Sequence, residues 1–435
     1  MKKVLIITYY WPPSGGGGVQ RWLKFVKYLP QFGWKPLVIA PENPEYPVID
    51  NSLRDDIPSE AEIIKLPIWE PYGVFKRFTG RKREEKVNAG LLFDDRQQSL
   101  PEKISLWIRG NFLIPDPRVF WVKPAFRRLK KLIPEIDPDI IVTTGPPHSV
   151  HLIGYKLKKR FNLTWAADLR DPWANIDFLE KFYPSIFALK RQERLERRVL
   201  SAADRVLSVS PEWSKELGQV CNQKTACIPN GFDEDDVIQG EFQNSEAFVI
   251  SHVGMLNSYR NNNVFWEALN ELCEESVHFS KRLQLRFFGI HDKSLGGHLA
   301  QFDNLRGKYI ISDYIPHSEV KNKYAQSDCL LIFQNRTKNA RGHIPGKVFE
   351  SIASKKPILT IADPNSDLAK IVSDCNAGYV CSFDNKELMK ESVRSVFHQF
   401  HKKPDWNKIQ IYSRKKLTEK LNAVLRETLD KKREI

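Results

Sequence analysis

Four consecutive glycines, at residues 15–18, follow the apolar run KVLIIT near the start of the chain. Glycine adopts positive φ and carries no Cβ, so such a turn lets backbone N–H groups approach an oxyanion closely. A helix starting near Val19 or Gln20 would add the positive end of its dipole. The position directly after a first strand favours a ligand-binding turn over a flexible loop. No G-x-G-x-x-G pattern is present, and Pro41 precedes Glu42 at the end of the second strand, which argues against a nicotinamide cofactor.

The stretch HIPGKVFE, residues 343–350, places a lysine and a glutamate one helical turn apart. Lys347 and Glu350 can therefore face the same ligand. A lysine at a helix start beside Gly346 is a natural partner for a diphosphate, and a carboxylate one turn later can accept both hydroxyl groups of a ribose. The alternative is a solvated ion pair. Because the stretch opens a helix before a buried strand, we favour the ligand-binding interpretation.

A third candidate is VGMLNSYRNN, in which Gly254 ends an expected strand and Arg260 follows it. Ligands collect at the carboxyl ends of strands in α/β sheets, and an arginine there can clamp a diphosphate with two parallel hydrogen bonds. An exposed loop arginine is the alternative.

Histidines and carboxylates follow two further strands. In TTGPPHSVH, His148 lies closer to the strand end than His151, which we place on the next helix. Either could orient a sugar or stabilise a leaving phosphate, and a structural role is almost equally open. In ADLRDPW, Asp168, Arg170 and Asp171 could fix an acceptor hydroxyl or form a structural ion-pair network.

These candidates need a scaffold in which strands and helices alternate. Buried strands are expected at KVLIITYY, KPLVIAP, AEIIKLP, PDIIVTTG, TWAADL and RVLSVS, with helices between most of them. The pattern restarts after CIPNGFD with strands at AFVISHVGML, LQLRFFG, CLLIF and PILTIA. Such alternation predicts parallel sheets with helices on both faces. We therefore expect two α/β halves, with a boundary near Pro229, in a chain of 435 residues.

The composition of the chain limits the class of protein, its location and its partners. Hydrophobic residues make up 41% and charged residues 28% of the chain, which suits a globular protein, and the net charge is +14. The apolar stretches are too short to cross a bilayer or to form a signal-peptide core, so we expect a cytoplasmic location. The six cysteines form no C-x-x-C pair and no zinc-finger spacing, and are expected to be reduced thiols. Patterns typical of nucleic-acid binding are missing, so nucleic acid is not expected as a partner.

The alternation fails between residues 69 and 131, where aromatic residues are interleaved with lysine and arginine. Two interpretations stay open: an ordinary insertion whose aromatics pack inward, or a surface that faces a membrane or an acceptor. Together with the basic helix at the end of the chain, the segment supports a hypothesis of peripheral attachment to an anionic membrane, at the inner face of the plasma membrane.

The combination of PPSGGGGVQR, VGML…R and PGKVFESIASKKPIL resembles retaining glycosyltransferases of the GT-B fold, and more narrowly the bacterial family-4 type that builds surface polysaccharides. The resemblance covers nearly the whole chain and is strongest over residues 254–378. It implies an α/β fold of two Rossmann-like domains facing a cleft. Residues 1–229 would form the acceptor domain, with the insertion at about 69–131. Residues 230–404 would form the nucleotide-sugar domain, and a helix in 405–435 would return to the N-terminal domain.

The resemblance also implies roles. Donor binding falls to Gly17 and Gly18, approaching the diphosphate from across the cleft, and to Gly254, Arg260, Gly346, Lys347 and Glu350. Catalytic roles fall to His148, Asp171 and Lys347, whereas Asp168, Arg170, His151 and His343 would orient the acceptor or the sugar. Many members carry two glutamates as E-x7-E; here Glu350 matches the second, and Gly342 stands at the first, which leaves the sugar open.

The implied reaction moves a hexose-type sugar from a nucleotide-diphosphate sugar to a hydroxyl of a lipid-linked or growing polysaccharide. GT-B enzymes usually stabilise the leaving diphosphate with cations and helix N-termini, so neither a metal nor a cofactor is expected. Retention of configuration comes from the resemblance alone. Two rivals stay open: a sugar-nucleotide epimerase of the same fold, and a basic protein that binds polyanions without turnover.

Overall fold

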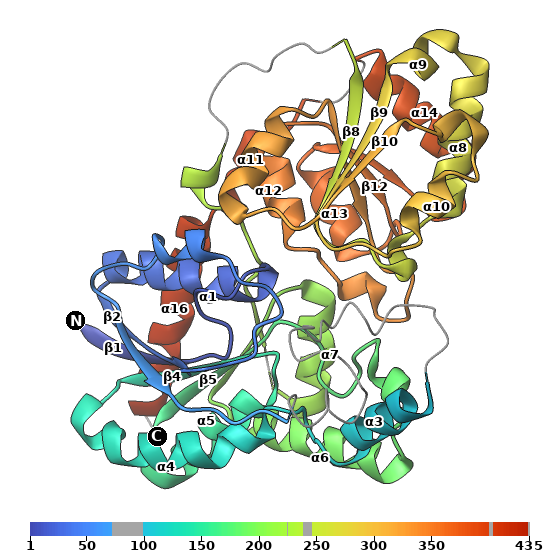
Figure 1. Cartoon of the computed structure of the whole chain (residues 1–435). Helices are drawn as coiled ribbons and strands as arrows, with labels where there is room; N and C mark the ends of the chain where they lie inside the picture. Colours follow the sequence, from blue (N-terminus) through green and yellow to red (C-terminus); the bar gives the residue numbers. More distant parts are fainter. Residues whose placement is uncertain (72–98, 224, 238–245, 400–402, 434–435) are drawn as a thin grey trace. The chain divides into compact units, whose positions relative to one another are not determined.

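The computed structural model describes residues 1–71, 99–223, 225–237, 246–399 and 403–433. Their contacts divide the chain into two compact units. Unit 1 comprises the described residues up to Pro229 together with those from Arg414 onward, and unit 2 comprises those from Asn230 to Ser413. Each unit is built on one parallel sheet with helices on both faces, as the alternation in the sequence predicts (Figure 1).

The sheet of unit 1 has the strand order β3-β2-β1-β4-β5-β6-β7. Its strands are β1 (Lys2–Ile7), β2 (Trp34–Pro41), β3 (Glu62–Leu66), β4 (Ile140–Gly145), β5 (Thr164–Leu169), β6 (Arg205–Ser208) and β7 (Ala226–Cys227). Its α-helices are α1 (Gly17–Tyr28), α3 (Leu100–Asn111), α4 (Val119–Ile136), α5 (Ser149–Phe161), α6 (Ile186–Ala202), α7 (Pro211–Cys221) and α16 (Arg414–Arg433). Short 3-10 turns lie at η1 (Leu29–Phe32), η2 (Asn51–Arg54) and η4 (Leu179–Phe182).

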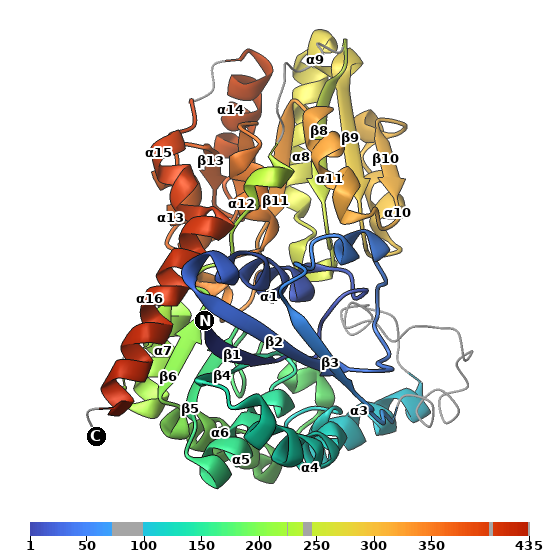
Figure 2. The same ribbon diagram turned by 90° about the vertical axis from the view of Figure 1, so that its left-hand side faces the viewer.

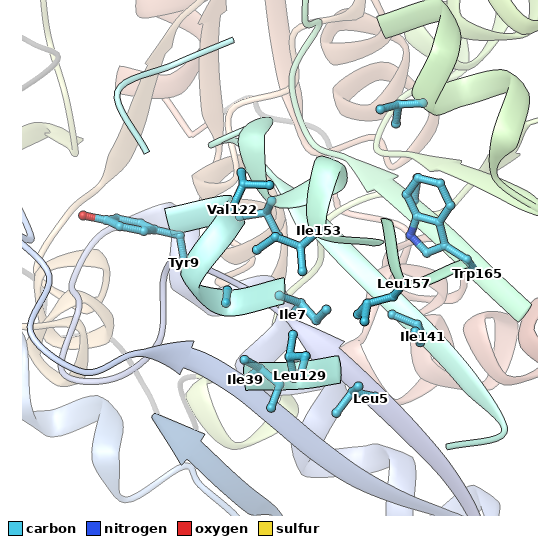
Figure 3. Packing of buried hydrophobic residues seen from close by; sticks show 14 of the residues in the cluster. Leu5, Ile7, Tyr9, Ile39, Val122, Leu129, Ile141, Ile153, Leu157 and Trp165 are labelled. Carbon is cyan, nitrogen blue, oxygen red and sulfur yellow. The ribbon is translucent and has the colours of Figure 1, made fainter. Parts of the chain in front are cut away.

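Side chains of β1 point alternately to the two faces of this sheet, and both faces are buried. Leu5 and Ile7 pack with residues of α4 and α5, as Figure 3 shows. Val4 and Ile6 pack on the other face with residues of α1 and α16. The last helix therefore returns to the N-terminal unit, where Figure 2 shows it lying beside the sheet.

Helix α4 forms the last part of the insertion expected at residues 69–131. Its residues Trp121, Val122, Ala125 and Leu129 belong to the core, so residues 119–131 lie in a regular covering helix in which Trp121 packs inward while Phe120 is exposed. Two internal prolines, Pro124 and Pro134, and a basic outer face concealed it in the sequence. The whole basic segment YGVFKRFTGRKREEK, residues 72–86, lies outside the described residues.

The sheet of unit 2 has the order β10-β9-β8-β11-β12-β13. Its strands are β8 (Phe248–Val253), β9 (Leu283–Phe288), β10 (Tyr309–Ser312), β11 (Cys329–Phe333), β12 (Ile358–Ile361) and β13 (Gly378–Cys381). Its α-helices are α8 (Asn263–Glu275), α9 (Val277–Arg282), α10 (Leu295–Leu299), α11 (His317–Ala325), α12 (Lys347–Ala353), α13 (Asp367–Asp374), α14 (Lys386–Phe397) and α15 (Trp406–Ile409). Its 3-10 turns are η5 (Glu234–Asp236), η6 (Ser258–Arg260), η7 (Asp303–Leu305), η8 (Ala340–Gly342) and η9 (Gln410–Tyr412).

In both sheets the strand order reverses next to the first strand of the unit. In unit 1, β1 lies between β2 and β4; in unit 2, β8 lies between β9 and β11. The carboxyl ends of strands at such a switch point form the usual ligand-binding crevice of a doubly wound sheet. The glycine turn follows β1, the histidine segment follows β4, and Gly254 follows β8, so the candidate residues of each unit gather at that edge.

Candidate active site

The carboxyl end of β8 is shaped by two glycines in backbone conformations that L side chains rarely adopt. Gly254 has φ +118° and Gly289, after β9, has φ +125°. A Cβ on Gly289 would lie 2.5 Å from the carbonyl oxygen of Gly254, so the two turns touch only because Gly289 has no side chain. A Cβ on Gly254 would lie 3.5 Å from Cδ and Nζ of Lys347, the first residue of α12, so the Lys347 side chain passes close to this turn.

Lys347 is held by a histidine that the sequence analysis did not single out. His252 of β8 is buried, and its Nδ1 lies 2.9 Å from the carbonyl oxygen of Leu331. A carbonyl only accepts, and the contact of Nδ1 is shorter than the 3.4 Å that separates Nε2 from the carbonyl oxygen of Met255, so we assign the proton to Nδ1 and leave Nε2 as an acceptor. Nζ of Lys347 lies 2.8 Å from that Nε2 and donates to it. Burial, and then the charges of Lys347 and Arg260, lower the pKa of His252 well below its usual value, so it stays a neutral acceptor.

Arg260 connects the loops that follow two neighbouring strands. Its Nε donates to Oδ1 of Asn335 after β11 at 2.6 Å, and its Nη1 donates to the carbonyl oxygen of Met255 after β8 at 2.9 Å. Burial lowers its pKa to about 10, so it remains charged at neutral pH. The third nitrogen of Arg260, Nη2, takes part in neither bond, so among the described residues it can still donate to a ligand. The loop is thus fixed while one guanidinium nitrogen is left to bind.

The charges at this edge of unit 2 are all of one sign. Burial, and next the charge of Arg260, lower the pKa of Lys347 well below its usual value. Burial, Arg260 and Lys347 likewise lower the pKa of His343 to about 3. Across the described residues, neither Lys347 nor Arg260 forms an ion pair with a carboxylate. An anion bound here would relieve the repulsion and favour the charged form of Lys347. The arrangement therefore has the charge and the hydrogen-bond donors that would suit an anion.

Glu350 lies one turn further along α12 at a separate pocket. Its Oε1 accepts a hydrogen bond from Nε2 of His317 at 3.1 Å. The pocket is also lined by Phe232, Tyr324 and Ala353, all within unit 2. One carboxylate oxygen is thereby oriented by His317, and the carboxylate faces a cavity rather than the bulk surface.

In unit 1, Arg170 fastens the glycine turn to the segment after β4. Its guanidinium donates from Nη1 to the carbonyl oxygen of Gly18, from Nε to that of Gly145 at 3.2 Å, and from Nη2 to that of Pro146. A Cβ on Gly18 would lie 3.4 Å from this Nη1 and 3.1 Å from the ring of Tyr10, whereas a Cβ on Gly17 would meet open space. The structure thus gives Arg170 a scaffolding role at the turn that the sequence predicts.

Asp168 is fully buried and its two oxygens are occupied. Arg21 forms an ion pair with Oδ1 at 2.8 Å, while Trp22 Nε1 and Thr144 Oγ1 donate to Oδ2 at 2.7 and 2.9 Å. Burial alone would raise the pKa of Asp168, but the charge and hydrogen bonds of Arg21, with Trp22, hold it below its usual value. The structure therefore favours the ion-pair network over contact with an acceptor.

His148 and His151 are packed rather than presented. The ring of His148 stacks on that of Trp173 at 5.0 Å, and Nδ1 of His151 lies 2.8 Å from Oγ1 of Thr143. Burial lowers the pKa of His151 to about 3 and shifts that of His148 downward as well. The backbone N–H of Ser149 at the start of α5 already donates to a carboxylate of the chain, Asp116, at 2.8 Å. A structural role, the alternative kept open by the sequence, fits these contacts better.

Asp171 differs from Asp168, which lies three residues earlier. It is half-buried in the loop after β5, and burial raises its pKa to about 6 despite the opposing charge of Arg170. Its carboxylate therefore changes charge near neutral pH, which suits a group that exchanges a proton with a ligand. A role for Asp171 in the reaction stays a prediction.

None of the described helices combines the length and apolar character needed to cross a membrane. Among the same residues, no cluster of three histidines, cysteines or carboxylates has a geometry that could hold a metal ion.

Comparison with known proteins places this geometry in a family. The profile described as Glycosyltransferase Family 4 matches residues 83–236, and that described as Glycosyl transferases group 1 matches residues 233–416. A search of curated protein sequences found no match.

Solved structures resemble the chain over its whole length. Sucrose-phosphate synthase from Thermosynechococcus elongatus has a TM-score of 0.65 at 12% identity, covering 98% of this chain and 99% of that one. WaaG, a glycosyltransferase involved in lipopolysaccharide biosynthesis, has a TM-score of 0.54 at 14% identity, with coverages of 97% and 99%. A protein assigned as a UDP-N-acetylglucosamine 2-epimerase from Listeria monocytogenes has a TM-score of 0.55 at 11% identity, with coverages of 99% and 98%.

The two parallel sheets and these neighbours define the GT-B class of folds. With the two family profiles, which together run from residue 83 to residue 416, they make the chain a GT-B glycosyltransferase of the family-4 type. The resemblance drawn from the sequence motifs is confirmed at that level.

Proposed function

We propose that the protein transfers a sugar from a nucleoside-diphosphate sugar to a hydroxyl group of a saccharide acceptor, with retention of configuration. The observation that carries the proposal is the Lys347–His252–Arg260 cluster, in which two basic side chains lie together without a carboxylate partner among the described residues. A diphosphate has the charge and the acceptor oxygens that such a cluster lacks.

The residues act on the leaving group first. As the glycosidic bond breaks, negative charge grows on the diphosphate, and the ammonium of Lys347 with Nη2 of Arg260 would stabilise it. Gly17 and Gly18 would bring further backbone N–H donors to the same group, a prediction taken from the resemblance. Glu350, whose Oε1 accepts a hydrogen bond from His317, would accept hydrogen bonds from the ribose hydroxyls, a role that also comes from the resemblance. These groups bind and neutralise charge without needing a metal ion.

On the acceptor side, Asp171 is our choice for the carboxylate that positions the reacting hydroxyl. Its pKa of about 6 leaves it ionised at neutral pH and protonated in mild acid. We propose that the acceptor is lipid-linked or a growing surface polysaccharide, met at the inner face of the plasma membrane. The fold shared with WaaG, whose process is lipopolysaccharide biosynthesis, supports that choice of acceptor class.

The decisive test is turnover of a panel of nucleotide-diphosphate sugars with and without saccharide acceptors, followed by release of the nucleotide diphosphate. Acceptor-dependent release is expected for one donor. Epimerisation of the donor with no acceptor present would instead support the epimerase, whose fold the chain shares equally well. Binding of donors and of unrelated polyanions with similar affinity, and no release, would support the polyanion-binding protein.

Substituting His252 tests the orientation of Lys347. In His252→Phe the ammonium loses its acceptor, so KM for the donor is expected to rise about tenfold, the effect of losing roughly one charge-assisted hydrogen bond. His252→Gln offers an amide N–H to Leu331 and an amide oxygen to Lys347, and should recover most of the affinity.

His278→Phe is the matched control, because His278 is exposed on α9 of the same unit. Its KM should equal that of the wild type. Equal KM values for His252→Phe and His252→Gln, with unchanged thermal unfolding, would show that His252 does not position Lys347.

A further inference from the structure

Helix α3 of unit 1 exposes the side that an amphipathic helix normally buries. Leu100, Ile104, Trp107 and Ile108 recur at helical spacing on one stripe, which would ordinarily face the core. Here they are exposed, Leu100 by 75% and Trp107 by 46%, while the opposite side of the helix is buried. The apolar stripe of α3 is therefore directed outward.

A second segment joins the stripe. Oδ1 of Asn111 accepts from the backbone N–H of Ser185 at 2.8 Å, and its Nδ2 donates to the carbonyl oxygen of Tyr183 at 3.0 Å. Gly110 packs so closely on Phe182 that a Cβ on Gly110 would come within 2.3 Å of the carbonyl oxygen of Phe182. The end of α3 is thus fixed to the loop before α6. Figure 1 shows the two helices in the same part of unit 1.

The joined segments present a large apolar surface, which we call the α3–α6 face. Phe187 at the start of α6 is exposed by 86% and Ile186 by 68%. The members of the face are Leu100, Ile104, Trp107, Ile108, Phe112, Tyr183, Ile186 and Phe187. Exposed apolar side chains gathered on two joined segments of a globular protein indicate an interaction site.

Positively charged side chains lie on α6 next to the apolar face. The solvent side of α6 beyond Phe187 carries exposed basic residues with a single exposed acid, Glu193, among them, whereas Glu196 is buried. These basic residues are Lys190, Arg191, Arg194, Arg197 and Arg198. Within the described residues, none of the five forms an ion pair with a carboxylate. An apolar tip beside a basic row is the pattern of proteins that lie on anionic lipid.

We propose that the α3–α6 face docks unit 1 on an anionic membrane surface. The apolar side chains would enter the boundary between headgroups and acyl chains, and the basic row of α6 would contact lipid phosphates. The choice of lipid as occupant is consistent with the proposed lipid-linked acceptor and rests on it in part. The geometry of the face itself is independent of the reaction.

Other occupants fit less well. A second copy paired about a two-fold axis would bring the same basic row against itself, and the like charges would repel. Single-stranded nucleic acid stacks on aromatic rings, but half of the face is aliphatic. The basic helix α16 offers no rival surface, because its apolar residues Leu417, Leu421 and Leu425 are buried in the core of unit 1.

Vesicle flotation of the full-length protein tests the proposal. We expect the wild type to float with vesicles that mix phosphatidylcholine and phosphatidylglycerol, and less with phosphatidylcholine alone. The double variant Ile186→Ser/Phe187→Ser should lose about tenfold or more in partitioning, because two large apolar side chains no longer leave water. The matched control Val277→Ser/Ile411→Ser removes two exposed apolar residues of unit 2 and should float like the wild type.

A second set of variants tests the basic row of α6. Lys190→Gln/Arg194→Gln should weaken flotation with the anionic vesicles and reduce its sensitivity to salt, whereas Lys416→Gln/Lys420→Gln on exposed α16 positions should not. Flotation of Ile186→Ser/Phe187→Ser equal to that of the wild type, or no wild-type flotation with anionic vesicles, overturns the proposal. If the wild type is a dimer and the double variant Ile186→Ser/Phe187→Ser is a monomer, the face binds a second copy of the chain instead. Donor turnover with a water-soluble acceptor is measured in parallel, so failure of docking and failure of transfer are separable.

Discussion

Lys347→Ala is expected to lower kcat by about a hundredfold to a thousandfold, the usual cost of removing one group that stabilises developing negative charge. The ammonium is held against Nε2 of His252 and repelled by Arg260, so it gains most when a diphosphate becomes more negative. Because this gain is larger in the transition state than in the bound donor, kcat should fall more than KM rises. Steady-state kinetics with the donor identified from the panel measures both constants.

Lys355→Ala is the matched control for this prediction. Lys355 lies just beyond the end of the same helix, is exposed, and interacts with the ring of Trp406 at 4.8 Å rather than with the cluster. It should retain near wild-type kcat. If Lys347→Ala keeps a folded structure and turns over within about threefold of the wild type, the ammonium has no part in leaving-group stabilisation.

The sequence predicts those parts of the site that depend on neighbours along the chain. The turn at residues 15–18 follows a buried strand, and Lys347 with Glu350 repeats at one helical turn, so period and turn chemistry are enough to place them. The parallel sheets follow for the same reason, since alternating strands and helices leave few topologies. Local patterning therefore carries most of the fold and the predicted donor residues.

Residues that act through distant partners could not be placed in this way. Arg21 meets Asp168 across 147 positions of sequence, and His252 meets Lys347 across 95. His252 looks like one polar residue in a buried strand, and only the packing of α12 over Gly254 reveals its role. A histidine in an otherwise apolar strand that ends at a glycine was the available signal.

The two interpretations left open for the region after residue 69 could not be separated from the sequence, for a related reason. Helix α4 carries prolines and a basic outer face, so its buried side was hidden, and α3 has a normal amphipathic period that predicts burial although its stripe is exposed. Period shows which residues share a side of a helix, but the neighbouring elements decide which side is covered. Docking of α3 on the loop around Phe182 makes that choice here.

Asp168→Ala is expected to destabilise unit 1 by about 3–5 kcal/mol, because it leaves the buried guanidinium of Arg21 without its counter-charge. Arg21 also donates from Nη1 to the carbonyl oxygen of Ile228 at 2.8 Å, which joins α1 to the chain after β7. Trp22 and Thr144 lose an acceptor in the same variant. Urea unfolding followed by tryptophan fluorescence measures the change, with nucleotide binding by unit 2 as a separate check on the rest of the protein.

The pH dependence distinguishes loss of this ion pair from loss of packing alone. The pKa of Asp168 is lower in the folded protein than in the unfolded chain, so its ionised form contributes stability that is complete above the unfolded value of about 4 and is lost as pH falls through the folded value. The gap in unfolding free energy between wild type and Asp168→Ala should therefore be constant near neutral pH and narrow below about pH 4. Glu62→Ala, which breaks the half-exposed pair with Lys35, should cost less than about 1 kcal/mol. A gap for Asp168→Ala as small as that for Glu62→Ala would mean that the buried network does not hold unit 1 together, and would reopen a role for Asp168 at the acceptor.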